Sequence, residues 1–265
     1  MSTPATLKQK ELAREKYEKK SRVENYPTYP KKVYGYENND GYYTSGTERN
    51  RSYKTGRCPR NLVKPAVKEL PEDMKVDKYH VSASDIICFS GRPHFLSSLY
   101  PSVLEVEGHK YSSLEQYYQA CKVYTLAGSG YAEQLRQIGD GGRVKIQAKK
   151  LLRVAKVPVE KIETWRRTHG PILLHHAIVH KFLQNVDLRE KLLKTGNAIL
   201  VHTYEYDNMF ASACNEEAVM KWAEAMDGQV LKVPQNIDDS TLDYVPLVGE
   251  GKNILGFISM KVSIF

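Results

Sequence analysis

The sequence predicts a single domain of the α+β class, mostly helical, over residues 84–265, with a basic segment in front of it over residues 1–83. Long stretches place apolar residues three and four positions apart, which is typical of helices packed on a core. Short apolar runs occur at only a few places, and these predict a small number of strands. Residues 1–80 contain no Trp, Phe or Ile, so the apolar surface available for burial belongs to the second part of the chain.

The front segment carries most of the net charge. Residues 1–80 contain 18 Lys and Arg against 11 Asp and Glu, and nine of the 18 tyrosines. Such a segment can bury little apolar surface, so we expect disorder, apart from a short charged helix at about residues 4–20. Basic residues interleaved with tyrosines can follow phosphates and stack on bases, which makes nucleic acid a candidate partner. A solubilising tail, or a tail that binds another partner, remains an alternative.

The composition indicates an intracellular protein, cytoplasmic or nuclear and not secreted. No apolar run is long enough to span a bilayer, so we expect no membrane partner. The N-terminus is charged rather than apolar, so no secretory signal is visible. The cysteines Cys58, Cys88, Cys121 and Cys214 are widely separated and form no CxxC pair, which favours reduced thiols over a zinc site or disulfides.

Strands are predicted where short apolar runs lie between turn residues. The four runs are residues 86–89, 103–106, 198–203 and 254–264, and Glu107-Gly108 forms a turn after the second. Residues 211–248 are expected as an insertion before the last strand.

Helices are predicted from apolar spacing together with capping residues. They begin at Ser112, span residues 143–156, begin again at Pro158 with Ile162 and Trp165, span residues 171–184, run from Asp187 to Leu193, and begin once more at Asn215. Inner positions are expected at Leu151, Leu152 and Val154 in the second of these helices, and at Leu174, Ala177, Ile178 and Phe182 in the fourth.

The helix that begins at Ser112 carries the candidate chemistry. Ser112 and Glu115 have the spacing of a capping box. Glu115, Gln119 and Lys122 follow one ridge at i, i+4 and i+7, so an acid and an amine share one face, as proton transfer or imine chemistry requires. The alternative is structural: Glu115 caps the helix and Lys122 is solvated or pairs with Glu115 or Glu105.

The predicted helix over residues 171–184 places His176 and His180 at i and i+4, a spacing that can hold a metal ion. No Glu stands between them and no third ligand is evident nearby. We therefore expect an ordinary helix surface, no metal site and no cofactor.

Several segments, taken together and in order, resemble the NADAR family (NAD- and ADP-ribose-associated, or YbiA-like, domains). The resemblance covers roughly residues 86–262. The matching segments are Phe95–Ser102, Ser113–Lys122, Lys181–Asn185, Leu192–Gly196, Leu200-Val201 through to Asp207, and Gly251–Gly256.

The resemblance implies a compact, mostly helical domain with a small sheet, and an N-glycosidase activity that cleaves bonds between ribose and nitrogen. Family substrates include ADP-ribose attached to guanine and phosphoribosylated intermediates of riboflavin metabolism. The favoured function is therefore a hydrolase that removes ADP-ribose from guanine in nucleic acid. A catalytically degenerate module that binds ADP-ribose or a related nucleotide, and a small-molecule glycosidase, remain alternatives.

The resemblance also implies site residues. Glu115, Lys122 and Asp207 match family positions and become the catalytic candidates, and Asn253 matches the asparagine of a closing Gly-x-Asn turn. The chain departs from the family at Ser98, where Asn is common, at His202, where Glu follows Leu-Val, and at Phe210-Ala211, where the family has Trp-Gly. The substrate-binding candidates are Ser98, Tyr118, Gln119, His202, Phe210, Lys252 and Asn253.

Overall fold

The computed structural model describes residues 62–263. The predicted helix at about residues 4–20 and the expected disorder of residues 1–61 lie outside the described part. The elements, in order, are β1 (Val76–His80), β2 (Ile86–Phe89), β3 (Leu104–Val106), β4 (His109–Tyr111), α2 (Leu114–Ala127), α3 (Ser129–Arg136), α4 (Gly141–Val154), α5 (Val159–Thr168), α6 (Gly170–Gln184), α7 (Val186–Leu193), β5 (Ile199–His202), α8 (Glu216–Ala225), β6 (Val230–Pro234), the 3-10 turn η1 (Leu242–Tyr244) and α9 (Ile254–Ser263).

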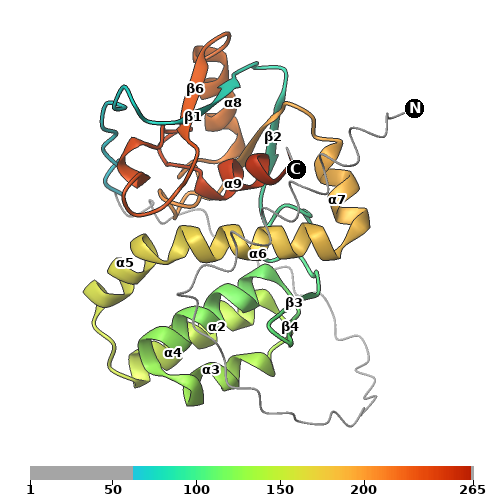
Figure 1. Cartoon of the computed structure of the whole chain (residues 1–265), viewed down its shortest axis with the longest axis vertical. Helices are drawn as coiled ribbons and strands as arrows, with labels where there is room; N and C mark the ends of the chain where they lie inside the picture. Colours follow the sequence, from blue (N-terminus) through green and yellow to red (C-terminus); the bar gives the residue numbers. More distant parts are fainter. Residues whose placement is uncertain (1–61, 264–265) are drawn as a thin grey trace.

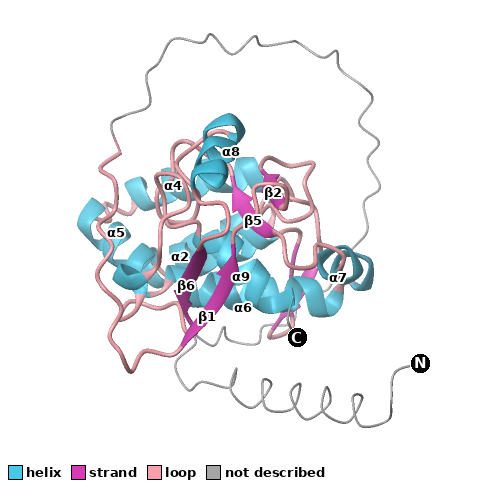
Figure 2. Cartoon of the chain, turned by 90° about the horizontal axis from the view of Figure 1, so that it is seen from above, coloured by secondary structure: helices cyan, strands magenta, loops and turns pink. Residues whose placement is uncertain are grey.

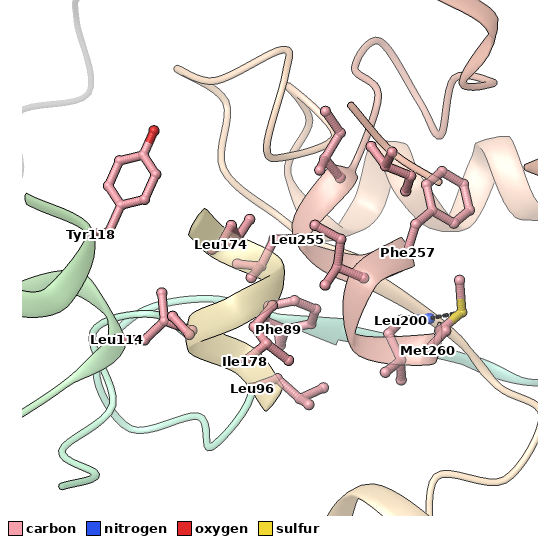
Figure 3. Packing of buried hydrophobic residues seen from close by; sticks show 14 of the residues in the cluster. Phe89, Leu96, Leu114, Tyr118, Leu174, Ile178, Leu200, Leu255, Phe257 and Met260 are labelled. Atoms are coloured by element: carbon pink, nitrogen blue, oxygen red, sulfur yellow. Dashed lines mark hydrogen bonds between the residues drawn. The ribbon is translucent and has the colours of Figure 1, made fainter. Parts of the chain in front are cut away.

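Helix α6 lies in the middle of the domain, with α2, α3 and α4 on one side and α9 with the strands β2 and β5 on the other (Figure 1). Pro171 is in its first turn, where a missing backbone N–H costs nothing. The predicted apolar stripe is confirmed: Leu174, Ala177, Ile178 and Phe182 are all buried. Figure 3 shows Leu174 and Ile178 of α6 packed between residues of α2 and α9.

Three separate two-stranded sheets complete the domain, which confirms the α+β class and the predominance of helices. Strands β2 and β5 pair in parallel, with Ile86 opposite Ile199, and β3 and β4 form a hairpin through the predicted turn at Glu107-Gly108. Strands β1 and β6 pair antiparallel, with Val76 opposite Pro234, and lie side by side in Figure 2.

The pair β1–β6 corrects one expectation. Disorder up to residue 83 is wrong for Val76–His80, because this stretch gains its backbone partners from β6. Order therefore begins before residue 84. The stretch 211–248, expected as an insertion, contains α8, β6 and η1, and it is packed into the domain because α8 contacts β2. Asn215 caps α8 as predicted, since its side chain accepts a hydrogen bond from the backbone N–H of Ala218.

The predicted strand over residues 254–264 is wrong, because this segment forms helix α9. Every residue from Ile254 to Lys261 is buried, so the sequence shows no polar face that would reveal a helical period. The backbone N–H of Leu200 in β5 donates to the sulfur of Met260 in α9 (Figure 3).

Helices α2, α3 and α4 enclose a smaller second core. Leu151 and Leu152 belong to it as predicted, whereas Val154 is 59% exposed and is not an inner position. Asp187 does not cap α7: the residue before the helix is Asn185, and Asp187 lies in the first turn, where its charge favours the helix dipole.

The two histidines of the spacing i, i+4 do not form an ordinary helix surface. The Tyr117 hydroxyl is 3.0 Å from Nδ1 of His176, and the Nε2 atoms of His176 and His180 are 3.1 Å apart. Burial lowers the pKa of His176 to about 3 and also lowers the pKa of His180. Within residues 62–263 no group of three or more His, Cys, Asp or Glu side chains is placed to hold a metal ion.

Two further observations concern the whole described part. No helix in it is long and apolar enough to cross a membrane. Cys88, Cys121 and Cys214 form no disulfide within the described residues.

Candidate active site

The first turn of α2 places Glu115 without using it as a cap. The predicted cap at Ser112 is wrong by one residue: the N-cap is Ser113, whose hydroxyl accepts from the backbone N–H of Gln116 at 3.2 Å. Gln116 returns the contact by accepting from the backbone N–H of Ser112 at 2.6 Å. Because the Ser113–Gln116 pair satisfies the helix end, the side chain of Glu115 is available for other contacts.

The Glu115 carboxylate is held from two sides although it is buried, at 7% exposure. Its Oε2 accepts from the Ser98 hydroxyl at 2.8 Å, and its Oε1 accepts from Nε2 of Gln119 at 2.7 Å. The side-chain amide oxygen of Gln119, Oε1, is buried and has no hydrogen-bond partner in the described part of the chain. Three of the predicted site residues are therefore brought together, and one of them presents an unused acceptor.

Lys122 lies two turns further along α2, and its ammonium makes no hydrogen bond or ion pair with any residue in the described range. Its Nζ is 5.9 Å from the centre of the Tyr118 ring. The pKa of Lys122 is lowered to about 8, mainly because the side chain is buried. The charge of Glu115 opposes this shift, and the positive charges of Lys145 and Arg166 contribute to it. The alternative in which Lys122 pairs with Glu115 or Glu105 is not what the structure shows.

Asp207 holds a turn and an arginine with a single oxygen. Its Oδ1 accepts from the backbone N–H groups of Met209 and Phe210, both at 2.9 Å, and from Nη2 of Arg166 at 2.6 Å. Its Oδ2 accepts no hydrogen bond from residues 62–263. Arg166 comes from α5, and the sequence gives no signal that would single it out from the other cations of that helix.

Aromatic rings form one wall beside these groups. The Tyr118 ring meets Phe210 edge-on at 5.9 Å between centroids, and Trp165 at 5.4 Å. Gly170 at the start of α6 makes the arrangement possible, because a Cβ there would lie 2.9 Å from the Phe210 ring and 3.0 Å from the Tyr118 hydroxyl.

His202 lies at the end of β5, among the other site residues. Its ring stacks between Phe89 and Tyr204, at 5.3 and 6.2 Å between centroids. Its Nδ1 is buried without a hydrogen-bond partner in the described part. Burial lowers the pKa of His202, and the charges of Asp207, Lys145 and Glu115 all act on it. The side chain that replaces the glutamate common in the family therefore lies among the catalytic candidates as a neutral ring.

The two substrate-binding candidates before α9 use their polar atoms on the backbone. Nζ of Lys252 donates to the carbonyls of Ala66 and Val245, at 3.2 and 3.1 Å. Asn253 donates to the carbonyl of Leu200 at 2.8 Å and accepts from the backbone N–H of His202 at 2.9 Å. The Asn253 contacts fix the end of β5, whereas Lys252 joins the segments around Ala66 and Val245. A direct role of either residue in substrate binding stays a prediction.

Sequence reasoning missed Lys145, Arg166 and Tyr204. None of them belongs to α2. Tyr204 lies in the matching stretch from Leu200 to Asp207, but the resemblance assigns no role to it. Nζ of Lys145 is 5.4 Å from the Tyr204 ring centre, and the Arg166 guanidinium is 5.2 Å from the Phe210 ring centre. Together they add two cations and an exposed ring to the site.

Among solved structures, the chain is similar to the NMR structure of the E. coli protein YbiA, at 20% sequence identity and a TM-score of 0.44, with 70% of this chain and 86% of that chain covered. A search of curated proteins found no match. The NADAR domain family matches residues 83–263, which include α2, the Asp207 turn and α9. The chain therefore belongs to the NADAR domain family.

Proposed function

We propose that this protein is an N-glycosidase that removes ADP-ribose from guanine in nucleic acid, with Lys122 as the nucleophile. The observation that carries the proposal is the state of Lys122. Its amine is largely desolvated, has a pKa lowered to about 8, and makes no ion pair within residues 62–263. A lysine kept partly neutral beside a fixed carboxylate is suited to imine formation.

The first step forms a bond between Nζ of Lys122 and C1 of the ribose. The bond from C1 to the guanine nitrogen breaks, and the departing base takes up a proton. Opening of the sugar ring at C1 leaves an imine between the sugar and the lysine. Water then hydrolyses the imine, which releases ADP-ribose and restores the amine, so the net reaction consumes one water.

Glu115 is placed to move the proton. It shares a helix ridge with Lys122, and its charge acts on the lysine without an ion pair between them. Ser98 and Gln119 fix the carboxylate, so little reorganisation is needed when the proton moves. Asp207 keeps Oδ2 available for a ribose hydroxyl or a water.

The test incubates the purified full chain, Lys122→Ala and Glu115→Gln with DNA that carries ADP-ribose on guanine. We expect the wild type to release ADP-ribose and both variants to lose at least about a hundredfold in rate. Borohydride added during turnover should trap a sugar adduct on the wild type and none on Lys122→Ala. Full turnover by Lys122→Ala, or no trapped adduct during turnover, would exclude the imine route.

A second candidate is a module that binds ADP-ribose without turnover. It is favoured by His202, because a neutral ring replaces a carboxylate that is common in the family. Binding of ADP-ribosylated guanine without release of ADP-ribose would support this function instead.

A third candidate is a glycosidase for phosphoribosylated small molecules of riboflavin metabolism, which would not need the basic front segment. Deletion of residues 1–61 separates it from the first, since activity on DNA should then fall and activity on the small molecule should not. The deletion must stop at residue 61, because residues 62–80 contain β1 and its connection to the domain.

A further inference from the structure

Helix α4 exposes basic side chains and no acidic ones, with Ile146 exposed among them. It carries five basic and no acidic residues over Gly141–Val154. All five side chains are exposed, and none makes an ion pair with another residue in the described range. They are Arg143, Lys145, Lys149, Lys150 and Arg153. The opposite face is buried against α2 and α3, so these exposed charges lie on the side of α4 that faces away from the second core.

The excess of positive charge is confined to α4 and is not a property of the whole domain. Residues 81–265 contain 21 Lys and Arg against 20 Asp and Glu, so the domain is almost neutral overall. Helices α5 and α7 mix acidic and basic residues, as solvated helices usually do. Like charges at i and i+4, as in Lys145–Lys149 and Lys149–Arg153, destabilise a free helix. A polyanion bound along this face would relieve that repulsion.

Three of the cations form a ridge that leads to the active site. Lys145, Lys149 and Arg153 are spaced at i, i+4 and i+8, so successive charges are about 6 Å apart along the helix axis. The end at Lys145 lies at the site, since its charge acts on Lys122 and its Nζ is 5.4 Å from the Tyr204 ring centre. The ridge therefore continues the site along α4.

A row of rings reaches the surface at the same end. Buried Phe89, His202 and Tyr204 stack in turn, and Tyr206 follows with its ring tilted by 60° against that of Tyr204. Tyr204 is 40% exposed and Tyr206 is 56% exposed. Exposed rings that are supported from behind by other rings offer flat faces on which bases can stack, and they do so without a preference for sequence.

We propose that a single strand of nucleic acid lies along the Lys145–Lys149–Arg153 ridge and stacks its bases on Tyr204 and Tyr206. The cations contact consecutive phosphates, and the rings hold the nucleotide beside Lys122. An anionic lipid surface would satisfy the cations equally well, but it gives no reason for the two exposed rings. Delivery of a modified guanine to Lys122 rests on the proposed function, whereas strand binding does not.

The test measures binding of the full chain to a fluorescent, unmodified single-stranded oligonucleotide by anisotropy, over a range of salt concentrations. The variant is Lys149→Gln/Arg153→Gln, which leaves Lys145 and the active site unchanged. The matched control is Lys191→Gln/Lys194→Gln, which removes two exposed cations at α7, across the domain from α4 (Figure 2). Because both double variants remove the same charge, a general charge effect would weaken both equally.

We expect the α4 variant to bind about tenfold more weakly, and its log–log salt slope to be smaller by about 1.4, which corresponds to two lost phosphate contacts. The α7 variant should keep both the affinity and the slope of the wild type. Tyr206→Ala should weaken binding at least about fivefold with an unchanged slope, since stacking is not ionic. Equal affinities for the two double variants would overturn the proposal, as would vesicle binding lost in the α4 variant with oligonucleotide binding retained.

Failure of the proposed function gives a different pattern. If the chain is not a glycosidase, Lys122→Ala and the wild type will both leave the substrate intact, while strand binding remains sensitive to the α4 substitutions. If the chain is a glycosidase but α4 binds no strand, the α4 variant will process modified oligonucleotide with the KM of the wild type.

Discussion

The lowered pKa of Lys122 is the property most open to direct measurement. A shift from 10.5 to about 8 corresponds to roughly 3 kcal/mol in favour of the neutral amine. At pH 7.5 about a quarter of the Lys122 side chains would then be neutral, against about one in a thousand for an ordinary lysine. Activity that depends on the neutral amine should therefore rise with pH and level off above about pH 8.

The assay follows the ¹³Cε signal of Lys122 by NMR between pH 6 and pH 11, with Lys122→Met for assignment. Glu115→Gln should lower the pKa of Lys122, because the Glu115 charge raises it, and Lys145→Gln should raise the pKa. Lys149→Gln, one turn from Lys145 on the exposed face, should leave it unchanged. The reasoning would be refuted if Lys122 of the wild type titrated near 10.5, or if Glu115→Gln, Lys145→Gln and Lys149→Gln all gave Lys122 the same pKa.

Three further predictions concern stability, each measured by urea unfolding. Burial lowers the pKa of His175 to about 4 and that of His176 to about 3. As the pH falls below 6.5, these histidines therefore take up protons in the unfolded chain before they do so in the folded chain, and by pH 5 each histidine lowers the free energy of unfolding by about 2 kcal/mol. Equal stability at pH 7.5 and pH 5 would contradict this. Gly256→Ala places a Cβ against a backbone carbonyl of β5 and should cost about 3 kcal/mol, whereas Gly130→Ala, with open space around it, should gain about 0.5 kcal/mol. Lys181→Met removes the ammonium that donates to the carbonyls of Phe95 and Ser97. The Phe95 carbonyl is then left unpaired, whereas the Ser97 carbonyl keeps its bond from the N–H of Tyr100, so the change should cost about 2 kcal/mol. A cost below about 1 kcal/mol would show that water replaces the ammonium.

Local pattern was sufficient for elements that have one buried and one exposed face. The stripe of α6 and the short runs of β2, β3 and β5 were predicted because their periods are visible in the sequence. The pattern failed for α9, where both faces are buried, and for β1, whose partner strand β6 lies far along the chain. No local signal distinguishes a strand that is completed by a remote partner from an extended tail.

The site residues likewise include some that local spacing predicts and others that only tertiary packing brings close. Glu115, Gln119 and Lys122 share one helix, so spacing alone places them on one ridge. The charges that set the state of Lys122 come from Lys145 and Arg166 on two other helices, and only tertiary packing brings them close. The family resemblance supplied Asp207, but not the use of one of its oxygens to hold Arg166.

The order of the elements along the chain has a consequence for synthesis on the ribosome. Helix α9 follows every other described element, yet it packs on α6 and β5 and is buried along most of its length. A nascent chain that lacks α9 therefore leaves the apolar sides of α6 and β5 exposed to water. Until α9 has been synthesised, chaperones would recognise these exposed apolar surfaces. In a truncated chain the same surfaces would cause aggregation. Early stop codons should for this reason cause loss of soluble protein, even when every predicted catalytic residue has already been translated.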